Sequence, residues 1–386
     1  MAIPIKYNIG NLMSRKVSAV MTVLGIGIVI AVMVAMMALY NGVQQALVTS
    51  GSKDNLLVLR EGAQTEATSW VSRDRYRIIS ALPGIERGSD GPLISPETVV
   101  IFKLPRHDNP TGSNVNVRGV TPKALEIRPY IKLLEGRMVR PGLYEVIVTR
   151  RMQKRFPNMN IGDTFKSGTY TWTVVGVFDA DGTSFDSEIW APVDQLNETQ
   201  KREDYSSVLL KPVDASAYQS IKDTVATDTR LKLLTKSEHQ YYEDQTSGLM
   251  GIQILVTIVT FFMVLGATLG AMNTMFSAVA SRKRELATMR ALGFKRRDIL
   301  LSIVIEAIVV SGLAGVVGVI LALPVNGIAT GTANFVTFSE VAFNFNISLE
   351  VALFAIGLAI VAGVIGGLLP AISAARLPIT RALREI

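Results

Sequence analysis

Four long apolar stretches recur along the chain: Val17–Leu39, Leu249–Ala280, Ile299–Leu323 and Val351–Ala375. Each holds more than the about 20 apolar residues that a helix needs to cross a bilayer. Glu306 is the single charged residue inside any of them. The pattern predicts four transmembrane helices rather than four buried helices of a soluble fold. The first stretch is too long for the apolar part of a signal peptide and lacks a small-residue cleavage site, so we expect it to remain as an anchor.

The stretch between the first two apolar runs has a different pattern, in which short segments rich in Val, Ile and Thr alternate with amphipathic ones. The expected strands are Asn55–Arg60, Thr98–Lys103, Asn114–Val120, Glu145–Thr149, Thr169–Phe178 and Ser206–Lys211. The expected helices are Arg73–Leu82, Arg150–Phe156, Val193–Asp204 and Ala215–Thr227. The fold class expected is an α-helical membrane protein with four transmembrane helices and a large mixed α+β extracytoplasmic domain between helices 1 and 2. Within that domain, we expect a strand-rich insert near residues 103–200.

Charge indicates the orientation in the membrane. Residues 41–248 contain 26 basic and 26 acidic residues, which leaves 13 of the 39 basic residues elsewhere. All 13 lie before the first apolar run, between the second and third, or after the fourth, whereas the loop 324–350 has no Lys or Arg. Because basic loops remain in the cytoplasm, both termini and residues 281–298 are expected to be cytoplasmic. Residues 41–248 and 324–350 are then expected outside.

Three parts follow from this plan. Residues 1–40 form the N-terminal cytoplasmic segment and the first transmembrane helix, and residues 41–248 form the external domain. Residues 249–386 carry helices 2–4 and a cytoplasmic loop at 281–298. The second apolar run has 32 residues, a helix of about 48 Å. This length exceeds the about 30 Å of bilayer hydrocarbon, so its outer end is expected to extend into the external domain, as is 41–49 at the end of the first helix.

Small residues four positions apart also recur in the apolar runs, at Gly266 and Gly270, Ser311 and Gly315, and Gly363 and Gly367. Such pairs let helices approach closely in lipid. They favour a packed bundle and a dimer, although Gly is simply common in membrane helices.

The composition excludes several kinds of chemistry. The chain has no Cys and only two His, so thiol catalysis, disulfides and Cys or His metal sites are not expected. No HExxH, GxSxG or GxGxxG motif occurs. The dipeptide Gly-Lys, which an ATP-binding Walker A loop needs, is also missing from these 386 residues. We therefore expect no catalytic, metal or cofactor site in this chain, no enzymatic activity of its own, and no nucleic-acid partner.

One acidic cluster, Asp179, Asp181, Asp186 and Glu188, invites comparison with a calcium loop. Its spacing lacks the order of ligands in an EF-hand. We therefore interpret it as a solvated turn between two strands.

Glu306 is a functional candidate because ionisable groups inside a membrane are costly to bury. A proton relay would need charged partners, and the other apolar runs contain none. The favoured interpretation is structural: a hydrogen bond within the bundle, or a pair with a basic residue at headgroup level.

The cytoplasmic segment 281–298 predicts a short amphipathic helix. Leu286, Met289 and Leu292 recur every three residues and form one apolar stripe. Gly293 is placed to end the helix. The charged residues around the stripe are Arg282, Lys283, Arg284, Glu285 and Arg290. The pattern leaves two alternatives open: a helix lying on membrane lipids, or a coupling helix that docks into a cytoplasmic partner.

The segment SRKRELATMRALGFKRRDIL closely resembles the cytoplasmic loop of FtsX-like ABC transporter permeases, the group that includes MacB, LolC, LolE and DevC. Further strings resemble other parts of that family in the same order. They are MTVLGIGIVIAVMVAMMAL for the first helix, VRGVTPKALEIRPYIKLLEGRMV and VVGVFDADGTSFDSEIWAPVDQL for the external domain, IEAIVVSGLAGVVGVILAL for the third helix, and LLPAISAARLPITRALR for the C-terminal end.

The resemblance implies the permease subunit of a mechanotransmission-type ABC system in the bacterial cytoplasmic (inner) membrane. Two permease chains pair, as a homodimer or heterodimer, and a cytoplasmic ATPase binds ATP and moves the external domains. MacB carries that ATPase before its first span, whereas about sixteen residues precede the first span here. The ATPase is therefore expected to be a separate chain.

The cargo implied is an antibiotic, peptide, lipid or lipoprotein, with a periplasmic adaptor and an outer-membrane channel as further partners. An alternative is an FtsX-type regulator that passes ATPase strokes to a cell-wall hydrolase without transport. That family usually has a much smaller external domain than the 208 residues found here.

Overall fold

A computed structural model describes residues 16–107, 111–333, 337 and 339–376. The chain divides into two compact units. The helical unit contains the described parts of 1–41, 251–328 and 345–386, and the sheet unit contains those of 42–250 and 329–344. The basic residues at positions 1–15 and 377–386, on which the predicted cytoplasmic location of the termini partly depends, lie outside the described residues.

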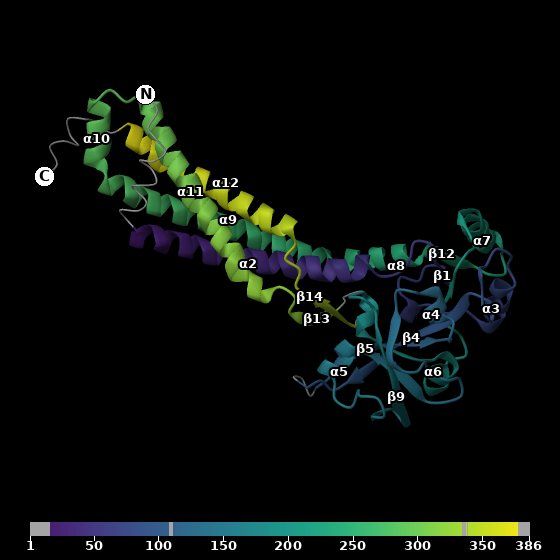
Figure 1. The fold of residues 1–386 in the computed structure, drawn as a ribbon. Coiled ribbons are helices and arrows are strands. Elements are labelled where there is room, and N and C mark those ends of the chain that lie inside the picture. The colour runs from purple at the N-terminus through teal and green to yellow at the C-terminus, as the bar shows by residue number, and fades with distance from the viewer. Residues whose placement is uncertain (1–15, 108–110, 334–336, 338, 377–386) are drawn as a thin grey trace. The chain divides into compact units, whose positions relative to one another are not determined.

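The helical unit contains the four predicted spans, and the fold class is confirmed. Long apolar helices occupy α2 (Lys16–Val48), α9 (Met250–Ser281), α11 (Arg296–Ala322) and α12 (Leu349–Ala375), and they lie side by side in Figure 1. Their shared core includes Ile30 of α2, Ala267 of α9, Ala314 of α11 and Ala359 of α12. A short helix, α10 (Lys283–Ala291), connects α9 to α11.

Helices α11 and α12 pack closely through two of the predicted small-residue pairs. A Cβ atom added at Gly363 would overlap the Ser311 hydroxyl, and one added at Gly367 would lie 2.7 Å from the Ala307 Cβ. Only glycine therefore fits at these two positions. By contrast, Cβ atoms at Gly266 and Gly270 of α9 would meet no atom of the described chain within 4 Å.

The sheet unit is built on a ten-stranded sheet with the order β12-β1-β11-β4-β5-β10-β7-β9-β6, in which β8 also pairs with β9. The strands are β1 (Leu56–Arg60), β4 (Ile94–Leu104), β5 (Ser113–Val120), β6 (Lys132–Gly136), β7 (Glu145–Thr149), β8 (Thr164–Ser167), β9 (Tyr170–Asp179), β10 (Glu188–Pro192), β11 (Ser207–Leu210) and β12 (Leu233–Ser237). Two further pairs are separate: β2 (Arg87–Gly88) with β3 (Gly91–Pro92), and β13 (Ala329–Ala333) with β14 (Glu340–Asn344).

Strand β4 joins two halves of this sheet. Its first residues, 94–97, pair with β11, whereas residues 98–104 pair with β5. The half that contains β1, β11 and β12 comes from the two flanks of the sequence, and we call it the flank half. The half that contains β5 to β10 comes from residues 98–192, and we call it the insert half.

Each half has helices and a core of its own. The flank half packs α3 (Arg73–Ser80) and α7 (Ala215–Thr227) on Val58 and Leu210, and the insert half packs α5 (Arg150–Arg155) and α6 (Val193–Thr199) around Trp172. Two more helices, α4 (Ala124–Ile127) and α8 (Glu238–Gln245), pack into a third core cluster that contains residues of both halves, such as Leu57 and Trp190. Side chains before the helices supply caps: Asp214 accepts from Ala217 N and Ser237 accepts from Gln240 N, which satisfies exposed amides at these helix starts.

The predicted elements match the structure where the apolar pattern is strong. Strand β7 and helix α7 have the predicted bounds. The helix predicted at Val193–Asp204 ends instead at Thr199, where the chain turns and Lys201 has a positive φ of 52°. Strands β6, β8, β10 and β12 were not predicted; β6 and β8 carry charged residues on exposed faces, which weakens their apolar pattern.

We predict that Gly363→Ala destabilises the helical unit by about 1–3 kcal/mol, because the added methyl overpacks the α11–α12 contact. Gly357→Ala, in the same helix, is the matched control and should be neutral or slightly stabilising, since a Cβ atom there would meet no atom of the described chain within 4 Å and Ala favours a helix. Thermal stability of the detergent-purified variants, followed by size-exclusion chromatography after heating, measures the difference. Equal losses for the two variants would contradict the close α11–α12 packing.

Candidate functional site

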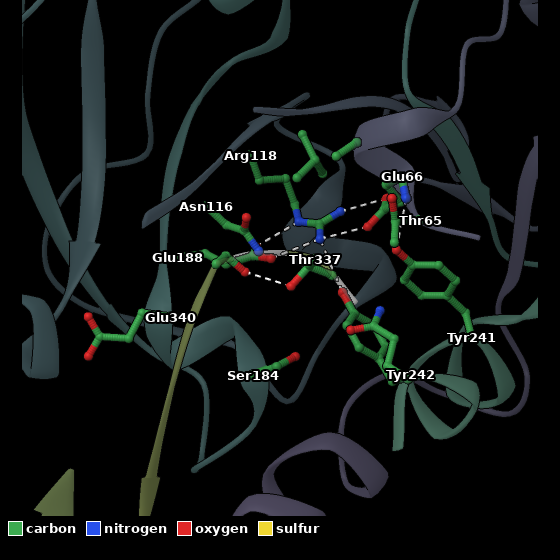
Figure 2. A pocket seen from close by; sticks show the side chains of 14 residues that line it. Thr65, Glu66, Asn116, Arg118, Ser184, Glu188, Tyr241, Tyr242, Thr337 and Glu340 are labelled. Atoms are coloured by element: carbon green, nitrogen blue, oxygen red, sulfur yellow. Dashed lines mark hydrogen bonds and ion pairs between the residues drawn. The ribbon is translucent and has the colours of Figure 1, made fainter. Parts of the chain in front are cut away.

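A buried polar cluster in the sheet unit is built around two arginines. Arg118 lies in β5, and its guanidinium contacts three carboxylates: Glu66 at 2.8 Å, Glu97 at 2.9 Å and Glu188 at 2.7 Å. Figure 2 shows Arg118 between Glu66 and Glu188. The Arg118 side chain is only 2% exposed, so these contacts are shielded from water.

The second arginine, Arg128, directly follows α4 and shares one of these carboxylates. It lies 2.6 Å from Glu97 and 2.6 Å from Glu238, the first residue of α8. Burial by itself raises the pKa of Glu97, but the charges of Arg128 and Arg118 outweigh burial and hold this pKa below its usual value. We call these six residues the arginine–carboxylate cluster: Glu66, Glu97, Arg118, Arg128, Glu188 and Glu238.

Additional hydrogen bonds satisfy the carboxylates of the cluster. Ser207 Oγ donates to Glu66, the Trp190 indole donates to Glu188, and the Asn55 amide donates to Glu238. Taking charges out of water is costly, and such a cluster is tolerated only when every remaining acceptor has a partner. The cluster is therefore a fully coordinated structural element rather than a reactive site.

The cluster fastens the two halves of the sheet unit together. Three of its carboxylates, Glu66, Glu97 and Glu238, come from the flank half. Both arginines come from the insert half, between β5 and the end of α4. Opposite charges therefore meet across the junction of the halves.

The same cluster holds the segments that adjoin the spanning helices. Glu238 accepts hydrogen bonds from Ser52 N at 3.1 Å and from Asn55 at 2.9 Å, both shortly after α2 ends. Ser50 bonds to Ser184 with 2.8 Å between the hydroxyls. Because Glu238 also begins α8, which leads into α9, the chain ends of α2 and α9 inside the sheet unit share one attachment point.

A cavity next to the cluster has room for about 20 Å³ of solvent and is lined by Glu66, Arg118, Glu188, Tyr242 and Glu340 among others. This is close to the space that one water molecule occupies. It is too small for a substrate. Among the described residues, no group of three or more His, Cys, Asp or Glu has the geometry for a metal ion.

The predicted solvated acidic turn is wrong for two of its four residues. The turn does join β9 to β10, but Asp186 and Glu188 are buried. Asp186 accepts from the Ala180 and Gly182 amides, and burial raises its pKa. Glu188 belongs to the arginine–carboxylate cluster. The sequence pattern does not reveal that these carboxylates point inward. Arg118, the partner of Glu188, is 70 residues away in the chain, and Asp186 contacts backbone amides, which leave no signal in the sequence.

The predicted coupling segment folds as α10 with its C-terminal glycine in place. Gly293 has a φ of +98°, its amide bonds to Arg290 O, and Phe294 N bonds to Met289 O. This backbone pattern is a Schellman motif, which needs a left-handed residue after the helix.

The sequence left the apolar stripe of α10 either on membrane lipids or in a partner, and the structure packs its first two residues against the chain itself. Leu286 is buried and Met289 packs beside it against Met275 of α9 and Ile299 of α11. Leu292, at the end of the helix, is 74% exposed. The stripe is therefore divided, because the spanning helices of the same chain offer an apolar surface that covers its first two residues.

Arg290 also turns toward its own chain. Its guanidinium donates to Ala375 O at 2.9 Å, at the last residue of α12. It satisfies a carbonyl at the end of a helix, where cations are favoured. The charged residues of α10 that stay exposed include Arg284 and Glu285.

Glu306 of α11 is 5% exposed and pairs with Arg282, the residue between α9 and α10. The two terminal guanidinium nitrogens of Arg282, Nη2 and Nη1, donate to the Glu306 carboxylate oxygens at 2.6 Å and 3.0 Å. Such bidentate pairs fix both distance and orientation. The pair connects the segment between α9 and α10 to the third span, α11.

The residues of the arginine–carboxylate cluster were not predicted as a site. The available signal was a charge inside an apolar strand pattern, as for Arg118 in NVNVRGV and Glu97 in ISPETVV. Charged residues are almost never fully buried unless they are paired. Applied to each strand, this rule would have selected both residues.

Comparisons with known proteins agree with this architecture. The MacB-like periplasmic core domain family matches residues 19–227, and the FtsX-like permease C-terminal family matches residues 257–379. The chain therefore belongs to the family of ABC transporter permeases that combine a MacB-like periplasmic core domain with an FtsX-like C-terminal region.

Individual relatives are distant. The macrolide export ATP-binding/permease protein MacB of Vibrio parahaemolyticus is 25% identical over 96% of this chain and 58% of its own length. The uncharacterized ABC transporter permease YknZ of Bacillus subtilis is 25% identical, with 98% of both chains covered. The chain thus spans somewhat more than half the length of the MacB relatives. The solved periplasmic region of MacB from Actinobacillus actinomycetemcomitans aligns with 48% of this chain and 90% of its own, at 14% identity and a TM-score of 0.38.

We predict that Arg118→Met destabilises the sheet unit by about 3–5 kcal/mol, because it leaves buried carboxylates without their counter-charge. Arg150→Met is the control, because Arg150 forms a 2.9 Å pair with Glu135 in which both side chains are more than half exposed; such pairs contribute less than about 1 kcal/mol. All three tryptophans, Trp70, Trp172 and Trp190, lie in the sheet unit. Tryptophan fluorescence during urea unfolding of the full chain therefore reports this unit. Similar midpoints for the two variants would rule out a stabilising role for the cluster.

Proposed function

We propose that this chain is the permease subunit of a mechanotransmission-type ABC exporter. A cytoplasmic ATPase, encoded as a separate chain, binds and hydrolyses ATP. Closure of the ATPase on ATP displaces α10, and the spans carry this displacement across the membrane. The sheet unit, on the outer side, then moves. The relative YknZ, named an ABC transporter permease and covered over 98% of both chains, supports the assignment of ATP binding to another chain.

The attachment of α10 carries this proposal. Three spans hold it: α9 through the apolar cluster that Leu286 joins, α11 through the same cluster and through the Arg282–Glu306 pair, and α12 through Arg290. A helix fixed in this way cannot tilt on its own. Force applied to its exposed face would be passed to the spans rather than lost in a flexible loop.

The exposed end of α10 is the proposed contact with the ATPase. Arg284, Glu285 and Leu292 are exposed there, whereas Leu286 and Met289 are covered by the chain itself. We therefore assign the docking role to Arg284, Glu285 and Leu292, and an anchoring role to Arg282, Leu286, Met289, Arg290 and Glu306. Gly293 ends the helix, so that Leu292 stands at its tip.

Further partners belong to the same proposal. A second permease chain completes the transporter, and the open face of α9 around Gly266 and Gly270 suits a close helix contact. The cargo is an antibiotic, peptide, lipid or lipoprotein handled outside the bacterial cytoplasmic membrane, with a periplasmic adaptor and an outer-membrane channel receiving it. The Vibrio relative is a macrolide export ATP-binding/permease protein, which is in line with this class of cargo.

We predict that residues 41–248 face outward and that α10 faces the cytoplasm. The chain has no Cys, so single cysteines can be placed at the exposed Lys222 of α7 and Thr288 of α10. A membrane-impermeant maleimide applied to spheroplasts should label Lys222→Cys, and Thr288→Cys should react only after lysis. The reverse pattern would invert the topology and remove the ATPase contact from α10.

We also predict that Leu292→Asp lowers recovery of the ATPase with the affinity-purified chain by about tenfold or more, because a desolvated, unpaired charge costs several kcal/mol. Leu349→Asp is the matched control, since Leu349 is 75% exposed and starts α12 at the opposite end of the α11–α12 pair. This control should retain the ATPase. Met289→Asp should instead lower the melting temperature of the chain, because Met289 packs against its own spans. Full recovery of the ATPase with Leu292→Asp would eliminate the proposed docking tip.

A further inference from the structure

The segment that connects the third and fourth spans belongs to the sheet unit. Strands β13 and β14 pair over five residues each, from Ala329↔Asn344 to Ala333↔Glu340. At the base of this hairpin, Gly327 N bonds to Phe345 O and Phe345 N bonds to Ile328 O. The chain therefore passes between the two units four times, rather than only through the two helices predicted from the sequence.

One carboxylate holds the hairpin to the insert half. Glu340 pairs with Arg155, at the end of α5, and lies 3.1 Å from Arg106, which follows β4. The three side chains are 11–19% exposed. A partly buried carboxylate between two guanidiniums depends on both for compensation of its lost hydration.

Contacts along β14 extend this attachment. Ala342 N donates to Ser187 Oγ at 2.6 Å, and the Arg151 guanidinium donates to Asn344 at 3.2 Å. Ala342 and Phe343 are 1% and 2% exposed. The hairpin is thus packed into the sheet unit by apolar burial, a backbone hydrogen bond and ion pairs together.

We infer that the β13–β14 hairpin is a third coupling element, which carries movement of α11 and α12 to the external domain, and that Glu340 is the residue that keeps it attached. This inference rests on the proposed mechanotransmission. Helices α11 and α12 are the spans that Glu306 and Arg290 connect to the cytoplasmic loop. Without the hairpin, displacement of these two spans would reach the sheet unit only indirectly, through α2 and α9. With the hairpin, α11 and α12 deliver force directly to the sheet unit, beside Ser187 and the turn after β9.

The test uses the full chain bound to its ATPase in lipid nanodiscs and measures hydrogen exchange of sheet-unit peptides, without nucleotide and with ATP plus vanadate. In the unmodified complex, nucleotide should change exchange in the sheet unit. Glu340→Gln should reduce this nucleotide-dependent change to less than about half and speed exchange at the β14 amides about tenfold. ATPase recovery should be unchanged. Glu135→Gln is the matched control, because it breaks an exposed ion pair of the same chemistry on the same unit, and it should leave the change intact.

Rescue separates coupling from a loss of stability. Ser187→Cys with Ala342→Cys, added to Glu340→Gln, should restore the nucleotide-dependent change when oxidised and lose it again on reduction, because the bond replaces the lost attachment. Two outcomes overturn the hairpin inference alone. In the first, the Glu340→Gln complex retains the full nucleotide-dependent change in hydrogen exchange. In the second, the oxidised cysteine variant does not regain that change. If the unmodified complex shows no nucleotide-dependent change, the proposed function fails, and this inference fails with it.

Discussion

The sheet unit depends on the burial of two guanidiniums among four carboxylates. Neither arginine could be buried alone, because an uncompensated charge away from water costs several kcal/mol. Glu97, which both arginines contact, makes the six residues a single cooperative element. Since the carboxylates of the flanks meet the arginines of the insert, the halves of the sheet cannot separate without exposing unpaired charge. The segments after α2 and before α9 are attached to the same group, so the connections to the membrane are as firm as the junction itself.

The helical unit repeats this chemistry on a smaller scale. A single bidentate pair, Arg282–Glu306, places a charge within the third span and compensates it from the loop that follows α9. Arg290 adds a bond to the end of α12. A short helix is thereby made part of the bundle, although nine residues would be a marginal helix in water. Firm attachment at both ends is what the transmission of a mechanical stroke requires.

Local pattern predicted much of this architecture. The four spans, the position of the large domain and the bounds of β7 and α7 follow from apolar runs and from periodicity. Features decided by distant partners could not be predicted in this way. The stripe of α10 is covered by α9 and α11, Glu188 points inward to Arg118, and the loop between the third and fourth spans pairs as a hairpin inside the sheet unit. In each case the sequence specifies an amphipathic helix, a charged residue or a polar loop, and only the fold determines which part of the chain it contacts.

The split pairing of β4 has a consequence for how such chains diversify. Residues 98–192 leave and rejoin the flank half at neighbouring strands, so that a recombination event could exchange them as one cassette. Any replacement would inherit three buried carboxylates, Glu66, Glu97 and Glu238, that are already in place. It would have to bring basic side chains to positions equivalent to Arg118 and Arg128, or fail to fold. The surface of the cassette is free to vary in evolution, but its inner edge is not.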